Sequence, residues 1–165
     1  MVTHVVAANP ALRRRLAVVD PAGCWLARWR DQFARLEIDV LRSPIVHHPA
    51  VEPGALARFV ADGGLPRSAL PYDPPLTTTF DAFCDALVHR HGLGELPERG
   101  TVASIEPSGD GTTAEITTDR TSLRARHVVW TANTATPVIP SAFRSGSLAG
   151  RHAPLGGPVV HGGRV

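Results

Sequence analysis

The chain has 165 residues, of which 43% are hydrophobic and 19% are charged, a balance typical of a folded globular protein rather than a disordered one. Its formal net charge of +2 is too small and too dispersed to indicate a nucleic-acid partner. The sequence has neither the apolar core of a signal peptide nor a run of about twenty apolar residues that could cross a membrane. We therefore predict a cytoplasmic protein without a nucleic-acid or membrane partner.

The first element expected is a helix within residues 2–15. Pro10 must interrupt it, because proline lacks the backbone N–H that a helix interior needs. The apolar face formed by Val2, Val5 and Val6 has no evident partner in the sequence, so we expect it to be exposed and available for association.

A short buried strand is predicted at residues 16–19, an unbroken Leu-Ala-Val-Val run that ends at Asp20. In doubly wound dinucleotide-binding folds, the second parallel strand ends in an acid whose carboxylate accepts hydrogen bonds from ribose hydroxyls. The alternative is that Asp20 begins an Asx turn with the Pro-Ala-Gly that follows. The residue alone leaves both interpretations open.

Residues 25–38 have apolar side chains at near-helical spacing, which predicts a helix with Trp25 and Trp29 on one face. Trp25 either packs against a cofactor or belongs with Trp29 in the core. The following residues, 40–44, are expected to be extended. There Arg42 could bind a phosphate or substrate through its two-pronged guanidinium, or it could form an ordinary surface ion pair.

Further along the chain, helices are predicted at residues 53–62 and 80–90, with Thr79 as the N-cap and Gly92 as the end of the second. From Thr101 the apolar period changes to two, which predicts a three-stranded meander that runs into a final parallel strand. These strands are expected at residues 101–106, 114–118, 123–130 and, for the final one, 127–131.

His47 and His48 do not predict a metal site, because adjacent side chains of an extended segment point to opposite sides and no further ligand has suitable spacing. A packed loop is the better interpretation of this segment. Cys24 and Cys84 lie far apart without a Cys-x-x-Cys spacing. We predict that both are free, buried thiols in a reducing compartment.

Three stretches of the sequence can be compared with a known family: GCWLARWRDQFARLEIDVLRSP at residues 23–44, LPYDPPLTTTFDAFCDALV at residues 70–88 and HVVWTANTATPVIPSAF at residues 127–143. The first begins within the Asp-Pro-x-Gly-x-Trp run at residues 20–25 that follows the predicted strand, and it ends in a Leu-Arg-Ser-Pro run. Together these stretches resemble the flavin-dependent N-hydroxylating monooxygenases, the group that hydroxylates lysine or ornithine.

This resemblance implies the α/β class and a partial Rossmann-type FAD-binding domain at residues 1–143, with parallel strands, helices and a three-stranded β-meander. Residues 144–165 would be a linker or disordered tail. The implied cofactor is FAD, with NADPH as the hydride source of the complete family protein. By the same resemblance, Asp20 would bind the ribose and Trp25 would cover the flavin or lie near the pyrophosphate.

The resemblance also implies that the backbone of Val102 touches the adenine and that the small Ala132 lets the chain pass close to the cofactor. Two glycine motifs of the family are missing, however. No Gly-x-Gly-x-x-Gly precedes the strand to bind the FAD pyrophosphate, and no second one follows for NADPH. We therefore expect this chain to be an internal portion of a flavin-dependent oxidoreductase, and we expect the portion to be inactive by itself. The alternative is a truncated, non-catalytic remnant that binds no cofactor or serves only as an interaction module.

Overall fold

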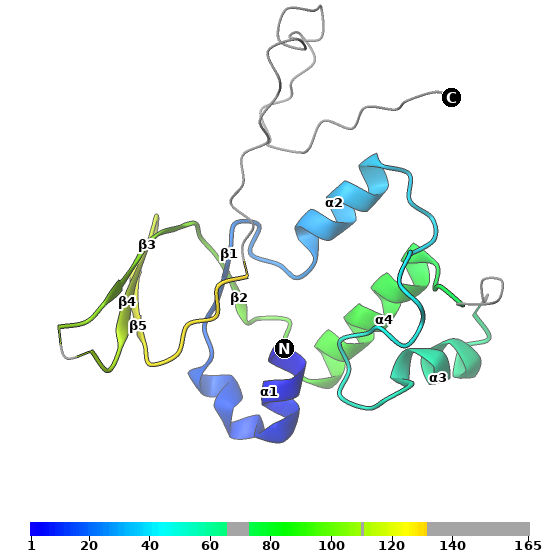
Figure 1. The fold of residues 1–165 in the computed structure, drawn as a ribbon, viewed down its shortest axis with the longest axis horizontal. Helices are drawn as coiled ribbons and strands as arrows, with labels where there is room; N and C mark the ends of the chain where they lie inside the picture. The colour runs from blue at the N-terminus through cyan, green and yellow to red at the C-terminus, as the bar shows by residue number, and fades with distance from the viewer. Residues whose placement is uncertain (66–72, 110, 132–165) are drawn as a thin grey trace, which may run out of the picture. The chain divides into compact units, whose positions relative to one another are not determined.

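The computed structural model describes residues 1–65, 73–109 and 111–131. The chain divides into two compact units, Met1–Arg126 and His127–Val165, and the helices and strands described here all lie in the first. The protein is mixed α/β, as the sequence predicts (Figure 1). Its elements in chain order are α1 (Val2–Ala8), the 3-10 helix η1 (Pro10–Arg15), β1 (Val18–Asp20), α2 (Ala27–Arg35), α3 (Ala55–Asp62), α4 (Thr77–Arg90), β2 (Pro97–Arg99), β3 (Val102–Pro107), β4 (Ala114–Thr118) and β5 (Ser122–Ala125).

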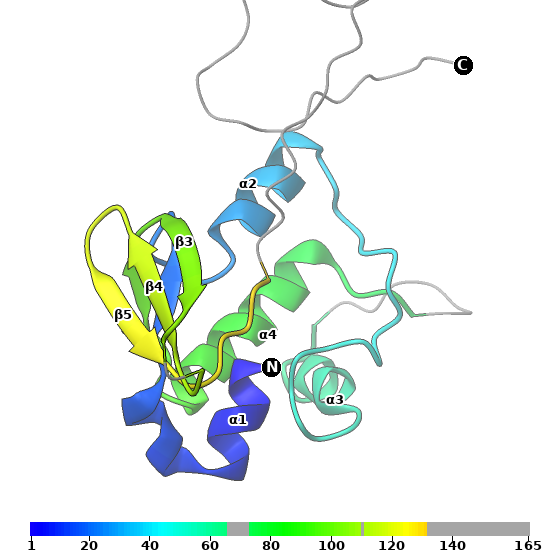
Figure 2. The ribbon, with the colours of Figure 1, turned by 60° about the vertical axis from the view of Figure 1, so that its left-hand side comes forward.

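The strands form two sheets. β1 and β2 pair in parallel, with Asp20 opposite Arg99. β3, β4 and β5 form the antiparallel meander that the sequence predicts, and Figure 2 shows its three strands side by side. β2 was not predicted, because its Pro-Glu-Arg sequence carries no apolar run or alternation. It becomes a strand through its pairing with β1.

The expected final strand is not formed. β5 ends at Ala125, and residues 127–131 pair with no strand that the structure describes. Val128, Val129 and Trp130 are exposed there. The prediction was wrong because apolar composition favours a strand, whereas strand formation also requires a neighbour to complete the backbone hydrogen bonds.

The main core lies between α3 and α4, which are neighbours at an angle to each other in Figures 1 and 2. Leu56 of α3 is completely buried, and Phe83 and Leu87 of α4 meet it one helical turn apart. The core is completed by Ile45, Ala50, Ala55 and Val60. None of the helices within the described ranges is long and apolar enough to cross a membrane.

α4 begins earlier than the sequence predicts. Thr77 donates its backbone N–H to the carbonyl of Asp39 at 2.8 Å and its hydroxyl to the carbonyl of Ile38 at 2.5 Å. Thr79 is therefore a buried residue of the first turn and not the N-cap. The end of the helix is as expected, with Gly92 at a φ of +60° just beyond it.

α1 is packed, contrary to the expectation of an exposed apolar face. Val6 is buried, and the Thr3 hydroxyl donates a hydrogen bond of 2.6 Å to the carbonyl of Pro49. The predicted interruption at Pro10 is confirmed, since α1 ends before it and η1 begins there. The Asn9 side chain caps η1 by accepting from the backbone of Ala11.

Candidate functional site

The carboxyl ends of β1 and β2 form the candidate site. The parallel register places Asp20 and Arg99, the last residues of the two strands, at the same edge. In open α/β sheets, ligands bind outside the carboxyl ends of the strands. A hollow of about 300 Å³ lies next to Arg99 and is lined by Val19, residues 98–100, Thr118, Arg120 and Thr121, whereas Asp20 does not line it.

Asp20 forms the Asx turn that was one of its two interpretations. Its Oδ1 accepts a hydrogen bond of 2.8 Å from the backbone of Ala22. Its carbonyl oxygen accepts from the backbone N–H groups of Gly23 and Gly100, both at 3.0 Å. A carboxylate has about four acceptor positions, so the turn leaves capacity for a ligand, and ribose binding by Asp20 stays a prediction.

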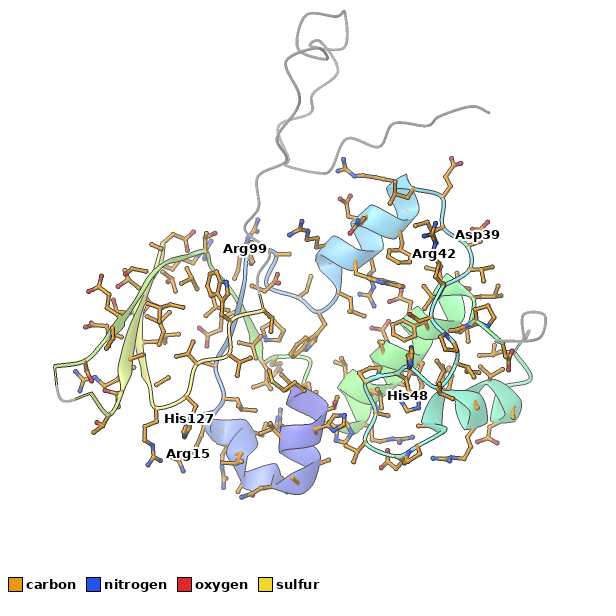
Figure 3. All side chains as sticks on the ribbon, in the orientation of Figure 1. Arg15, Asp39, Arg42, His48, Arg99 and His127 are labelled. Atoms are coloured by element: carbon orange, nitrogen blue, oxygen red, sulfur yellow. The ribbon has the colours of Figure 1, made fainter. Side chains whose placement is uncertain are left out.

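The turn after β1 rests directly on Arg99. Gly23 has a φ of +68°, and a Cβ atom there would lie 2.8 Å from the Cβ of Arg99. Paired positions of neighbouring strands share a face of the sheet, so Asp20 and Arg99 are on one face and Val19 and Glu98 are on the other. The Arg99 side chain is exposed at this edge (Figure 3).

Gly100 joins the parallel pair to the meander. It is buried, and a Cβ atom at this position would lie 3.4 Å from Oδ1 of Asp119. That carboxylate oxygen accepts a 2.8 Å hydrogen bond from the backbone of Thr101, whose carbonyl accepts from the backbone of Asp119 at 3.0 Å. These bonds fix the β4–β5 turn beside β2 and place Arg120 at the hollow.

Trp25 does not lie on a helix with Trp29, so the prediction of a shared helical face was wrong. Leu26 has a φ of +59°, which delays the start of α2 until Ala27. The indole Nε1 of Trp25 donates a 2.9 Å hydrogen bond to the carbonyl of the buried Leu93. This contact supports the structural interpretation, in which Trp25 anchors the entry to α2.

Among the described residues, α2 contacts α4 through an aromatic pair and a branched ion pair. Trp29 lies 5.7 Å from Phe80 between ring centroids. Arg30 binds Asp81 at 2.8 Å and Asp85 at 2.6 Å. The hydrogen bond to Asp81, followed by that to Asp85, raises the pKa of Arg30. These contacts position the helix and bring no group to the β1–β2 edge.

The remaining predicted site residues do not gather around Asp20. Arg42 is exposed and lies far from Arg99 in Figure 3. The backbone N–H of the preceding Leu41 donates a hydrogen bond to the carbonyl of Pro75, just before α4. Val102 begins β3, where the register shifts before Ser104. Ala132 lies outside the described residues.

His48 lies in a packed loop, as expected, whereas His47 is exposed. The His48 ring makes an edge contact with Phe83, with 5.7 Å between centroids. Both of its ring nitrogens are buried without a hydrogen-bond partner in the described part of the chain. Within those same ranges there is no group of three or more His, Cys, Asp or Glu side chains that could hold a metal ion.

Both cysteines are free thiols, as predicted, but only one is buried. Burial raises the pKa of Cys84 to about 12, and the charges of Asp81 and Asp85 add to this effect. Cys24 is exposed in the turn before α2. Its predicted burial was wrong, because the strained turn at residues 23–26 carries it to the surface.

Sequence reasoning missed Arg99, Gly100 and Arg120, because their positions depend on a strand without an apolar pattern. At the β1–β2 edge, Asp20 keeps hydrogen-bond acceptor capacity and Arg99 lies beside it. Trp25 and Arg42 are not part of this edge.

Comparison with protein-family models, with curated proteins and with solved structures finds no match to this chain.

Proposed function

We propose that this chain is the FAD-binding portion of an FAD/NAD(P)-dependent oxidoreductase, and specifically of a flavin monooxygenase-like protein. One observation carries the proposal: Asp20 ends a strand whose parallel partner, β2, ends at the same edge. The antiparallel meander follows directly. This order of acid-terminated strand, helices and meander is the order that the sequence resemblance implies.

In this proposal Asp20 accepts hydrogen bonds from the ribose hydroxyls of the adenosine half, through the capacity that the Ala22 backbone leaves unused. When bound, FAD supplies the redox chemistry, and NADPH supplies the hydride in the complete protein. The chain itself binds and orients the nucleotide. Trp25 contributes by fixing the segment that follows the turn. Arg42 lies away from this edge, and its binding role stays a prediction.

The test is a titration of FAD, followed by the quenching of its fluorescence, against three proteins: the unchanged chain, Asp20→Asn and Asp62→Asn. An asparagine at position 20 keeps the oxygen that accepts from Ala22 and replaces the other oxygen by a donor. We expect saturable 1:1 binding that Asp20→Asn weakens by about tenfold, the effect of losing a hydrogen bond to a charged group. Asp62 is exposed at the end of α3, so its substitution is the matched control.

The proposal is contradicted if no quenching occurs up to roughly 1 mM FAD, a binding free energy weaker than about −4 kcal/mol. It is also contradicted if the two variants behave alike while circular dichroism shows both to be folded. Either result favours the alternative of a non-catalytic remnant that binds no cofactor.

A further inference from the structure

Arg99 is placed to act together with Asp20 on one ligand. The two residues are register partners at the ends of neighbouring parallel strands, which are separated by roughly 4.8 Å. Their side chains share a face of the pair, because paired positions point to the same side. A ligand group bound to the carboxylate would therefore have a guanidinium one strand spacing away.

The backbone around Arg99 is fixed, although its charged end is exposed. Gly23 leaves no room for a further atom between the turn and the Cβ of Arg99, and the adjoining Gly100 is held by the carbonyl of Asp20 at 3.0 Å. The base of the Arg99 side chain is thus in a set position.

The guanidinium is not engaged by an acid in the described part of the chain. Neither Arg99 nor Asp20 takes part in an ion pair between described residues, although they are direct neighbours. Oδ1 of Asp20 instead accepts from the Ala22 backbone. Arg99 consequently retains its planar set of five donors, an arrangement suited to the oxygens of a phosphoryl group.

We propose that Arg99 binds a phosphoryl group of the nucleotide whose ribose Asp20 holds, and so makes the site selective for phosphorylated over unphosphorylated adenosine. This inference rests on the proposed function, because Asp20 must hold the ribose. In this inference, Arg99 provides hydrogen-bond donors to the phosphoryl group in a chain that lacks the glycine-rich loop of the family. We also expect much of the affinity at this edge to depend on ionic strength, since the guanidinium is exposed to solvent.

The experiment measures the dissociation constants of adenosine, adenosine 5′-monophosphate and adenosine 2′-monophosphate by equilibrium dialysis at low ionic strength. The proteins are the unchanged chain, Arg99→Gln, Asp20→Asn and, as a control for total charge, Arg14→Gln. Arg14 is exposed in η1, which precedes the amino end of β1. FAD carries its phosphoryl groups on the 5′ oxygen of this ribose, so adenosine 2′-monophosphate serves as the positional control.

We expect adenosine 5′-monophosphate to bind the unchanged chain and Arg14→Gln about tenfold more tightly than adenosine, consistent with a charge-assisted hydrogen bond. Adenosine 2′-monophosphate should show no such gain, because its phosphoryl group replaces a hydroxyl that Asp20 binds. Arg99→Gln should abolish this preference and leave adenosine binding unchanged, whereas Asp20→Asn should weaken adenosine and adenosine 5′-monophosphate alike. A preference that persists in Arg99→Gln, or that Arg14→Gln removes equally, overturns the inference alone. Adenosine binding that does not depend on Asp20 contradicts the proposed function instead.

Discussion

Replacing Gly23 by alanine should destabilise the protein through the contact between the turn and β2. Two separate effects act at this position. The φ of +68° is a left-handed conformation, which costs a residue with a Cβ about 1–2 kcal/mol. In addition, the new Cβ would lie 2.8 Å from Cβ of Arg99 and 3.1 Å from its Cα. The strand or the turn must then shift, at a cost of about 1–3 kcal/mol for overpacking.

Gly64 provides the matched control. Its φ is +59°, but a Cβ atom at Gly64 would meet no described atom within 4 Å. Gly64→Ala should therefore lose only the conformational part, about 1–2 kcal/mol, while Gly23→Ala should lose about 2–5 kcal/mol in total. Both alanines restrict the unfolded chain to a similar degree, so this effect cancels in the comparison.

The assay is urea unfolding of the two variants beside the unchanged chain, monitored by tryptophan fluorescence. Equal m-values would allow the free energies of unfolding to be compared directly. If Gly23→Ala is no more destabilised than Gly64→Ala, the turn does not rest on Arg99. The geometry of the candidate site would then be wrong.

Three further outcomes test the packing and the charged groups. Leu56→Ala, which empties a completely buried position, should lower the free energy of unfolding by about 2–5 kcal/mol. Val46→Ala, at a side chain that is 65% exposed, should change this free energy by less than about 0.5 kcal/mol. Similar losses in the two variants would place the core elsewhere. Arg30→Gln should lower the free energy of unfolding by less than about 1 kcal/mol, and this decrease should vanish in high salt, because the Arg30 side chain is 38% exposed. A large decrease that does not depend on salt, measured by urea unfolding, would contradict this prediction. Alkylation followed by mass spectrometry should modify Cys24 in the native protein and Cys84 only after unfolding. Since the pKa of Cys84 rises from 9.0 to about 12 on folding, its contribution to stability should be constant below pH 9 and decrease between about pH 9 and 12, a decrease that Cys84→Ala should remove.

Local sequence signals predicted the elements that depend on local physics. α3 and α4 have apolar side chains one turn apart and glycines beyond their ends, so both appear in the sequence and in the structure. The meander was likewise visible from its alternation and its turn residues. The interruption of the first helix followed from Pro10, whose missing N–H acts wherever the rest of the chain lies.

Features that depend on tertiary pairing could not be predicted in this way. β2 has no apolar residue except its first, Pro97, and becomes a strand only because β1 lies beside it. Conversely, residues 127–131 have strand composition and pair with no described strand. Trp25 was placed on a helix because helical spacing does not reveal the left-handed Leu26 that separates it from α2.

The candidate site was predicted in part. Asp20 was identified from its place after an apolar run, and the Asx turn was one of its two interpretations. Arg99 could not be found from sequence, because 79 positions separate it from Asp20 and only the parallel register brings them together. The binding role of Val102 and Ala132 remains a prediction from the resemblance.

The most direct test of the proposed site is a titration of ¹⁵N-labelled protein with FAD, followed by amide chemical shifts. Binding at the β1–β2 edge predicts that the amide signals of Ala22, Gly23 and Gly100 move together and saturate at one equivalent, because these N–H groups are bonded to Asp20. Signals from α3 should stay unchanged. Shifts confined to α3 and α4, or no shifts at millimolar FAD, would contradict the account.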